Sequence, residues 1–160
     1  MLKMKMLFLV VSLCSVISVF AQKPVGGEWA IGARFGGSIG ATLKKYSVYN
    51  TSALEFMGAW NFDNRIDGFA LSALWEKLAP LSHSTQLSAF IGGGATAAFG
   101  SKFKMGASGI IGIDWRFKMV PINLQFDWMP TYFFINDNYF SPVNGALSVR
   151  YLLNNRGRRR

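Results

Sequence analysis

The sequence contains almost none of the residues that build disulfides and most metal centres. Its 160 residues include one cysteine, Cys14, and one histidine, His83. Cys14 lies in a leader segment described below, so the rest of the chain offers no disulfide and no cysteine-based zinc site. We therefore expect neither a metal nor a cofactor.

Charged residues are scarce, and after the first twenty residues no apolar run is long enough to cross a membrane as a helix. Charged residues make up 16% of the chain, against 51% hydrophobic and 15% aromatic residues. Much of the net charge of +9 comes from Lys3, Lys5 and the arginines between Arg156 and Arg160. Because the remaining positive charges are scattered, we expect no basic face and no nucleic-acid partner.

Residues 1–21 have the pattern of a cleaved secretory signal peptide. Lys3 and Lys5 form a charged region, an apolar run follows over residues 6–19, and the small Ala21 precedes Gln22. The alternative is an N-terminal membrane anchor, for which the apolar run is short. We expect cleavage after Ala21, export, and then a short lead-in over residues 22–27.

The clearest structural signal lies between Pro121 and Pro130. Seven residues there alternate strictly, with Ile122, Leu124, Phe126 and Trp128 on one face and Asn123, Gln125 and Asp127 on the other. This period of two predicts a β-strand. An aspartate between Phe and Trp favours a polar interior and an apolar exterior. That arrangement is the reverse of a soluble sandwich and is typical of a transmembrane β-barrel.

Seven further segments have alternating or glycine-rich sequence, and turn signals separate them. The predicted strands are residues 29–35, about 38–46, 53–62, 69–77, 86–99, 105–117, about 121–133, and a last one ending near Tyr151. Residues 79–85, with Pro80 and His83, are predicted to form a turn. We therefore predict an all-β fold, an eight-stranded antiparallel up-and-down transmembrane β-barrel over residues 28–153, followed by a basic tail over 154–160.

The polar faces of these strands carry eight charged residues, four of each sign: Arg34, Lys44, Glu55, Glu76, Asp114, Arg116, Asp127 and Arg150. On the lipid face of a membrane barrel, each Arg or Lys at mid-membrane would cost about 2–4 kcal/mol. We therefore expect these residues inside, as a salt-bridged plug that fills the lumen. The alternative interpretation of the same cluster is a gate, a pore lining or an active site.

Aromatic residues fall near the two ends of the predicted strands, where a membrane barrel has its interface belts. One predicted belt contains Trp29, Tyr46, Trp75, Trp115 and Tyr151, and the other contains Trp60, Trp128 and Tyr132. Lys44 and Lys45 are adjacent, so they cannot both face inward. We expect Lys45 at the interface beside Tyr46, with its ammonium group towards water.

No arrangement of residues indicates catalysis. His83 lies in a predicted turn with no carboxylate in register, and no Ser/His pair is visible near either rim. The glycines 92–94 lack the following Lys-Ser/Thr and the helix of a phosphate-binding loop. Glu55 and Glu76 could act as acid and base, but the nearby cations favour ion pairing. We predict that the protein is not an enzyme.

Four segments taken together resemble one family: Gly-Ala-Arg-Phe-Gly-Gly at 32–37, Ile-Asp-Trp-Arg at 113–116, Phe-Asp-Trp-Met-Pro at 126–130 and Ser-Val-Arg-Tyr at 148–151. Over about residues 28–153 the chain resembles the small eight-stranded outer-membrane β-barrel proteins of Gram-negative bacteria. The resemblance implies a monomer in the outer membrane that contacts its lipid and is inserted by the barrel-assembly machinery. It also implies longer exposed loops at 63–67, 100–104 and 134–142.

One departure from that family concerns the end of the chain. The last strand in the family usually ends at an aromatic residue, whereas here residues 152–160 follow Tyr151. Our first functional hypothesis is a closed barrel with a structural or surface-interaction role. The alternative is a narrow passive pore. A further alternative is a soluble secreted barrel that binds a small apolar ligand, with Arg34, Glu55, Asp127 and Arg150 facing outward.

Overall fold

The computed structural model describes residues 27–49, 51–62, 68–82, 86–117, 119–136, 138–142 and 144–153. The predicted signal peptide, the basic tail over 154–160 and His83 lie outside these residues. Every regular element in the described ranges is a β-strand. No helix in the described part of the chain has the length and apolar character needed to cross a membrane.

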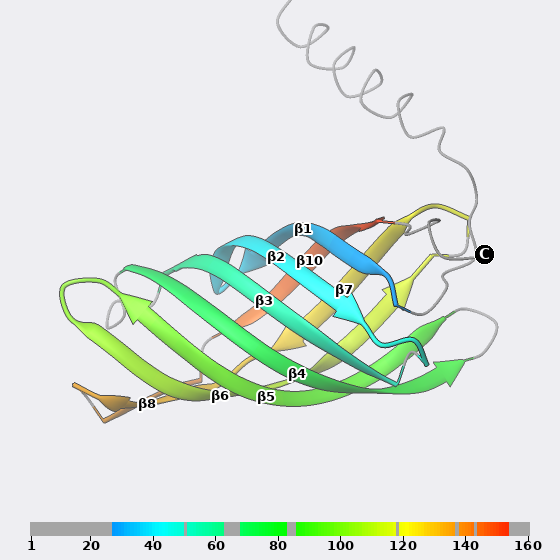
Figure 1. Cartoon of the computed structure of the whole chain (residues 1–160). Coiled ribbons are helices and arrows are strands. Elements are labelled where there is room, and N and C mark those ends of the chain that lie inside the picture. Colours follow the sequence, from blue (N-terminus) through cyan, green and yellow to red (C-terminus); the bar gives the residue numbers. More distant parts are fainter. Residues whose placement is uncertain are drawn as a thin grey trace, which may run out of the picture.

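The strands close into one barrel (Figure 1). In chain order the described residues form β1 (Trp29–Gly36), β2 (Ser38–Tyr46), β3 (Ser52–Asn61), β4 (Gly68–Ser82), β5 (Leu87–Phe99), β6 (Phe103–Arg116), β7 (Ile122–Trp128), β8 (Thr131–Ile135), β9 (Tyr139–Ser141) and β10 (Gly145–Leu153). All strand pairs are antiparallel, and the barrel closes where β1 pairs with β10.

Two of the eight wall strands are interrupted. β7 and β8 both pair with β6, on either side of Met129 and Pro130, so together they make the seventh wall strand. β10 pairs with β7, and β9 pairs with β8, so these two make the eighth. The wall is therefore a closed, eight-stranded antiparallel barrel with up-and-down order, which confirms the predicted fold.

The barrel has two distinct ends. The terminal end holds the start of β1 and the end of β10, where Trp29 pairs with Leu153, and also the turn between β2 and β3. The hairpin end holds the β1–β2 turn at Gly37 and the β5–β6 turn at residues 100–102. In Figure 1 the hairpin end lies at the left and the terminal end at the right.

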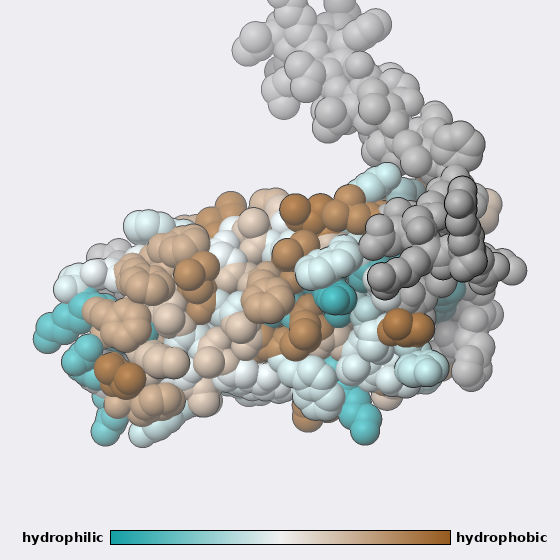
Figure 2. Space-filling model, in the orientation of Figure 1, coloured by the Kyte–Doolittle hydropathy of each residue, from teal (hydrophilic) through white to brown (hydrophobic). Residues whose placement is uncertain are grey.

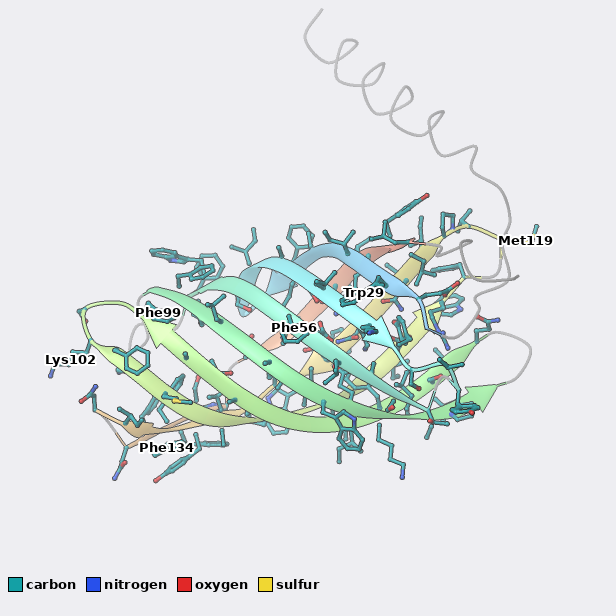
Figure 3. The ribbon with its side chains drawn as sticks, viewed as in Figure 1. Trp29, Phe56, Phe99, Lys102, Met119 and Phe134 are labelled. Atoms are coloured by element: carbon teal, nitrogen blue, oxygen red, sulfur yellow. The ribbon has the colours of Figure 1, made fainter. Side chains whose placement is uncertain are left out.

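Side chains alternate between the outer wall and the interior, as the period of two requires. In β10, for example, Leu147, Val149 and Tyr151 are exposed, whereas Ser148 and Arg150 are buried. Large apolar side chains are exposed on the outer wall, and Figure 2 shows brown and tan patches on the one face it draws. Figure 3 labels Phe56, one of these side chains. The barrel is thus apolar outside and polar inside.

Three strand boundaries differ from the prediction. β4 continues to Ser82, through the Pro80 that the sequence placed in a turn. The register shifts between Pro80 and Ser82, and such an irregularity suits a residue without an N–H group. Lys104 lies in β6 rather than in a loop, because β5–β6 pairing continues as far as Phe99 and Phe103. The predicted loop 134–142 contains the short strand β9.

A glycine lets neighbouring strands approach closely inside this narrow barrel. Gly94 of β5 lies on the inward parity, between the buried Phe90 and Thr96. A Cβ atom at Gly94 would overlap the backbone carbonyl oxygen of Ala73 on β4. At the outward Gly109 of β6, by contrast, a Cβ atom would meet nothing within 4 Å. The absence of a side chain at Gly94 therefore relieves crowding between β4 and β5.

We predict that Gly94→Ala destabilises the barrel by about 1–3 kcal/mol, because backbone of the adjacent strand must move to admit the methyl group. Gly109→Ala is the matched control and should leave stability within about 0.5 kcal/mol of the parent. Denaturant unfolding of the three purified proteins measures the difference. Equal stability of the two variants would contradict the close approach.

Candidate functional site

The interior of the barrel holds all eight of the charged residues that the sequence placed there. They come from strands on every side of the barrel, and each is at most 5% exposed. The members are Arg34 of β1, Lys44 of β2, Glu55 of β3, Glu76 of β4, Asp114 and Arg116 of β6, Asp127 of β7 and Arg150 of β10.

Lys44 is the centre of this network. Its Nζ lies 2.5 Å from Oε2 of Glu76, 3.1 Å from Oδ2 of Asp114 and 3.7 Å from Oε2 of Glu55. Nζ also donates to Oε1 of Gln125 at 2.6 Å and lies 4.6 Å from the centre of the Phe90 ring. One fully buried ammonium group therefore compensates carboxylates from three other strands.

Arg150 forms the second node. Its Nη2 contacts Oε1 of Glu55, and its Nη1 donates to Oδ1 of Asn123 at 3.0 Å and to Oε1 of Gln125 at 2.9 Å. Nε donates to Oγ1 of Thr42 at 3.1 Å. All three nitrogens of this guanidinium thus have acceptors, which is the condition for a buried cation to be tolerated.

Gln125 joins these nodes to the remaining ion pair. Its Nε2 donates to Oε2 of Glu55 at 3.2 Å and to Oδ2 of Asp127 at 3.0 Å. The same Asp127 oxygen accepts from Nη1 of Arg34 at 2.7 Å. The network therefore runs without a break from Lys44 to Arg34, and the neutral Gln125 is its connector.

The belt prediction for Tyr46 was wrong. The sequence analysis placed it at an interface, but it is fully buried and its hydroxyl donates to Oδ2 of Asp114 at 2.8 Å. The guanidinium carbon of Arg116 lies 4.6 Å from the centre of its ring. The reason is parity, since Tyr46 follows Lys44 by two residues and shares its face. Lys45 faces out instead, with Nζ 5.0 Å from the centre of the Trp29 ring.

The other predicted belt residues lie on the outer wall. Trp29 is half-buried, and the exposed members are Trp60, Trp75, Trp115, Trp128, Tyr132 and Tyr151. Nε1 of Trp128 donates to the carbonyl oxygen of Pro142 at 2.6 Å, so its polar edge has a partner. The Trp115 ring stacks on Phe117 at 4.4 Å between centres.

The charge pattern did not reveal several interior residues. Thr42, Asn123 and Gln125 lie on the inward parity and are visible in the alternation, but they are uncharged. Glu28 and Lys104 add one buried charge of each sign. Glu28 precedes the first predicted strand and Lys104 was placed in a loop. The observed start of β6 would have been the signal for Lys104. Glu28 lies just before β1 in the structure as well, and its signal was that it shares the parity of Ala30 and Arg34.

Apolar side chains close the interior on both sides of the charged layer. Leu78, Phe90 and Leu152 are buried in strand segments towards the terminal end. At the hairpin end Phe133 packs with Ala70 and Ala98. Apart from a small cavity beside Arg34, side chains therefore fill the described interior, as expected for a barrel of eight strands.

The chemistry of this interior is ion pairing. Glu55 and Glu76, the candidate acid and base, both contact Lys44. Among the described residues, no group of three or more His, Cys, Asp or Glu side chains is arranged to hold a metal ion. Comparison with protein-family models and with curated proteins gives no match.

We predict that Lys44→Met destabilises the barrel by about 3–5 kcal/mol, because it leaves buried carboxylates without their cation. Lys45→Met, one residue away on the outer wall, should change stability by less than about 1 kcal/mol. The double variant Lys44→Met/Glu76→Gln should recover part of the loss, since it removes the nearest of the uncompensated charges. Denaturant unfolding of all four proteins tests this. A tolerated Lys44→Met would contradict the network.

Proposed function

We propose that the protein is an integral outer-membrane β-barrel with a closed interior and a structural or surface-interaction role. The observation that carries the proposal is the inversion of the two faces. Side chains such as Phe56, Leu71 and Ile113 are 46–49% exposed on the outer wall, whereas Lys44, Glu55 and Glu76 are fully buried. An apolar surface around a whole barrel is far larger than the apolar patches of soluble monomers.

Lipid is the solvent that suits this wall. Closed barrels satisfy all strand hydrogen bonds internally, which the hydrocarbon region of a bilayer requires. The soluble alternative needs Arg34, Glu55, Asp127 and Arg150 on the outside and tryptophans around an internal cavity. The four charged residues are buried and Trp60, Trp75 and Trp128 are exposed, so the structure has the opposite arrangement.

The proposal assigns a role or an orientation to other parts of the chain as well. Residues 1–21 act as a cleaved export signal, the barrel-assembly machinery inserts the barrel as a monomer, and the terminal end faces the periplasm. The β5–β6 turn at the hairpin end spans only residues 100–102. A short turn of this kind supports a modest contact surface outside the cell rather than a large adhesive or receptor domain.

An arginine substitution on the outer wall tests whether that wall faces lipid or water. Phe56 lies in the middle of β3, and Phe56→Arg should cost about 2–4 kcal/mol if its side chain faces the hydrocarbon core. Val48→Arg, on the exposed β2–β3 turn, is the control and should be tolerated. Folding into lipid vesicles at increasing denaturant gives both values. Equal tolerance of the two arginines would contradict the membrane proposal.

A narrow pore is the second candidate, favoured by a small cavity that lies in the hairpin-end half of the interior. A continuous path would have to pass Lys44 and Arg150, whose side chains are fully buried. We predict that the purified barrel gives no steady conductance steps in planar bilayers. Steady conductance by the parent protein would favour the pore.

A further inference from the structure

The cavity in the hairpin-end half of the barrel has both polar and apolar side chains on its wall. Its volume is about 20 Å³, enough for one water-sized or halide-sized particle. Arg34, Ser38 and Asn144 lie on its wall, together with Thr131 and Phe133. A space of this size suits a single water molecule or a monatomic ion.

Arg34 supplies a charged donor that the protein itself does not use. Its Nη1 donates to Asp127 at 2.7 Å and its Nε to Oγ of Ser38 at 3.4 Å. Nη2 has no hydrogen-bond partner, although the side chain is fully buried. Asp127 is not part of the cavity wall, and Arg34 is the one charged side chain among the described residues that line it.

The hydroxyl groups of Ser72, Thr96 and Thr131 also belong to the wall of this cavity. A ladder of hydroxyl groups crosses four strands, with Ser72 and Thr96 at 2.8 Å, Thr96 and Ser108 at 2.6 Å, and Ser108 and Thr131 at 2.7 Å. Four hydroxyl groups joined by three hydrogen bonds leave one O–H hydrogen over. Elsewhere in the lining, Oδ1 of Asn144 already accepts from Ser38, which leaves its amide nitrogen.

We propose that this cavity binds a single halide-sized anion, with chloride as the natural candidate. Arg34 is the only charged residue among the described residues of the wall, and its Nη2 has no acceptor. A buried guanidinium N–H without an acceptor is costly, and an anion satisfies it more strongly than a neutral acceptor does. The proposal concerns the interior alone, so it stands or falls independently of the proposed membrane location.

The test measures thermal unfolding of the purified mature protein in detergent at constant ionic strength, with sodium gluconate replaced stepwise by sodium chloride. Gluconate is too large for the cavity. The unfolding midpoint should rise with chloride concentration, because the ion binds only the folded state. Crystals soaked in bromide should show an anomalous peak within hydrogen-bond distance of the Arg34 guanidinium.

Two variants and a control locate the site. Arg34→Gln/Asp127→Asn removes the charge pair but keeps the interior neutral, and it should abolish the chloride-dependent rise. Thr131→Val keeps both charges and should reduce the rise, which covers the case in which the double variant does not fold. Ser148→Ala removes a buried hydroxyl group outside the cavity wall, and the parent's response should persist.

Three results would overturn the proposal. The first is a midpoint that is the same in chloride and gluconate, with no bromide peak, which means that water fills the cavity. The second is a bromide peak without any effect of chloride in solution, which means an adventitious ion only. The third is a chloride effect that both Arg34→Gln/Asp127→Asn and Thr131→Val leave unchanged, which places the ion elsewhere.

Discussion

The structure depends on one constraint: charged side chains buried in the interior, away from bulk water, must be paired with charges of opposite sign. Lys44 places one ammonium group among the carboxylates of Glu55, Glu76 and Asp114, and the compensation depends on strand register because Lys44 pairs directly with Glu55 across β2 and β3. A slip of one residue would turn a whole strand's charged residues to the outer wall and its apolar ones inward. The ion pairs therefore select one register around the barrel.

Such a network contributes less to stability than its short distances suggest. Desolvating the ions offsets much of their mutual attraction, and an apolar core of the same volume is often as stable. A polar interior has another advantage here, since the outer wall already carries the apolar side chains. Because one face of each strand is polar and the other is apolar, the barrel closes favourably only with the polar faces inside. A filled, hydrogen-bonded lumen fits a scaffold or contact surface better than a conduit.

Much of the barrel could be predicted because one pattern determines both the strands and their faces. Alternation identified eight wall strands and the inward position of residues such as Arg34 and Arg150. Tyr46 was misplaced because aromatic identity was allowed to outweigh its parity with Lys44. Pro80 was predicted in a turn and Lys104 in a loop. Both lie in strands, because residue type is a weak guide to where strand pairing ends. The partners of Gln125 and the cavity beside Arg34 depend on contacts between distant strands, which no local pattern contains.

The most direct test of the account is the behaviour of the mature protein in cell envelopes. Membranes from a Gram-negative host that expresses the chain are fractionated, and boiled and unboiled samples are compared on an SDS gel. The account predicts that the protein is in the outer-membrane fraction and that boiling shifts its mobility, because a closed barrel resists detergent until it is heated. A protein in the soluble periplasmic fraction, with the same mobility before and after boiling, would contradict it.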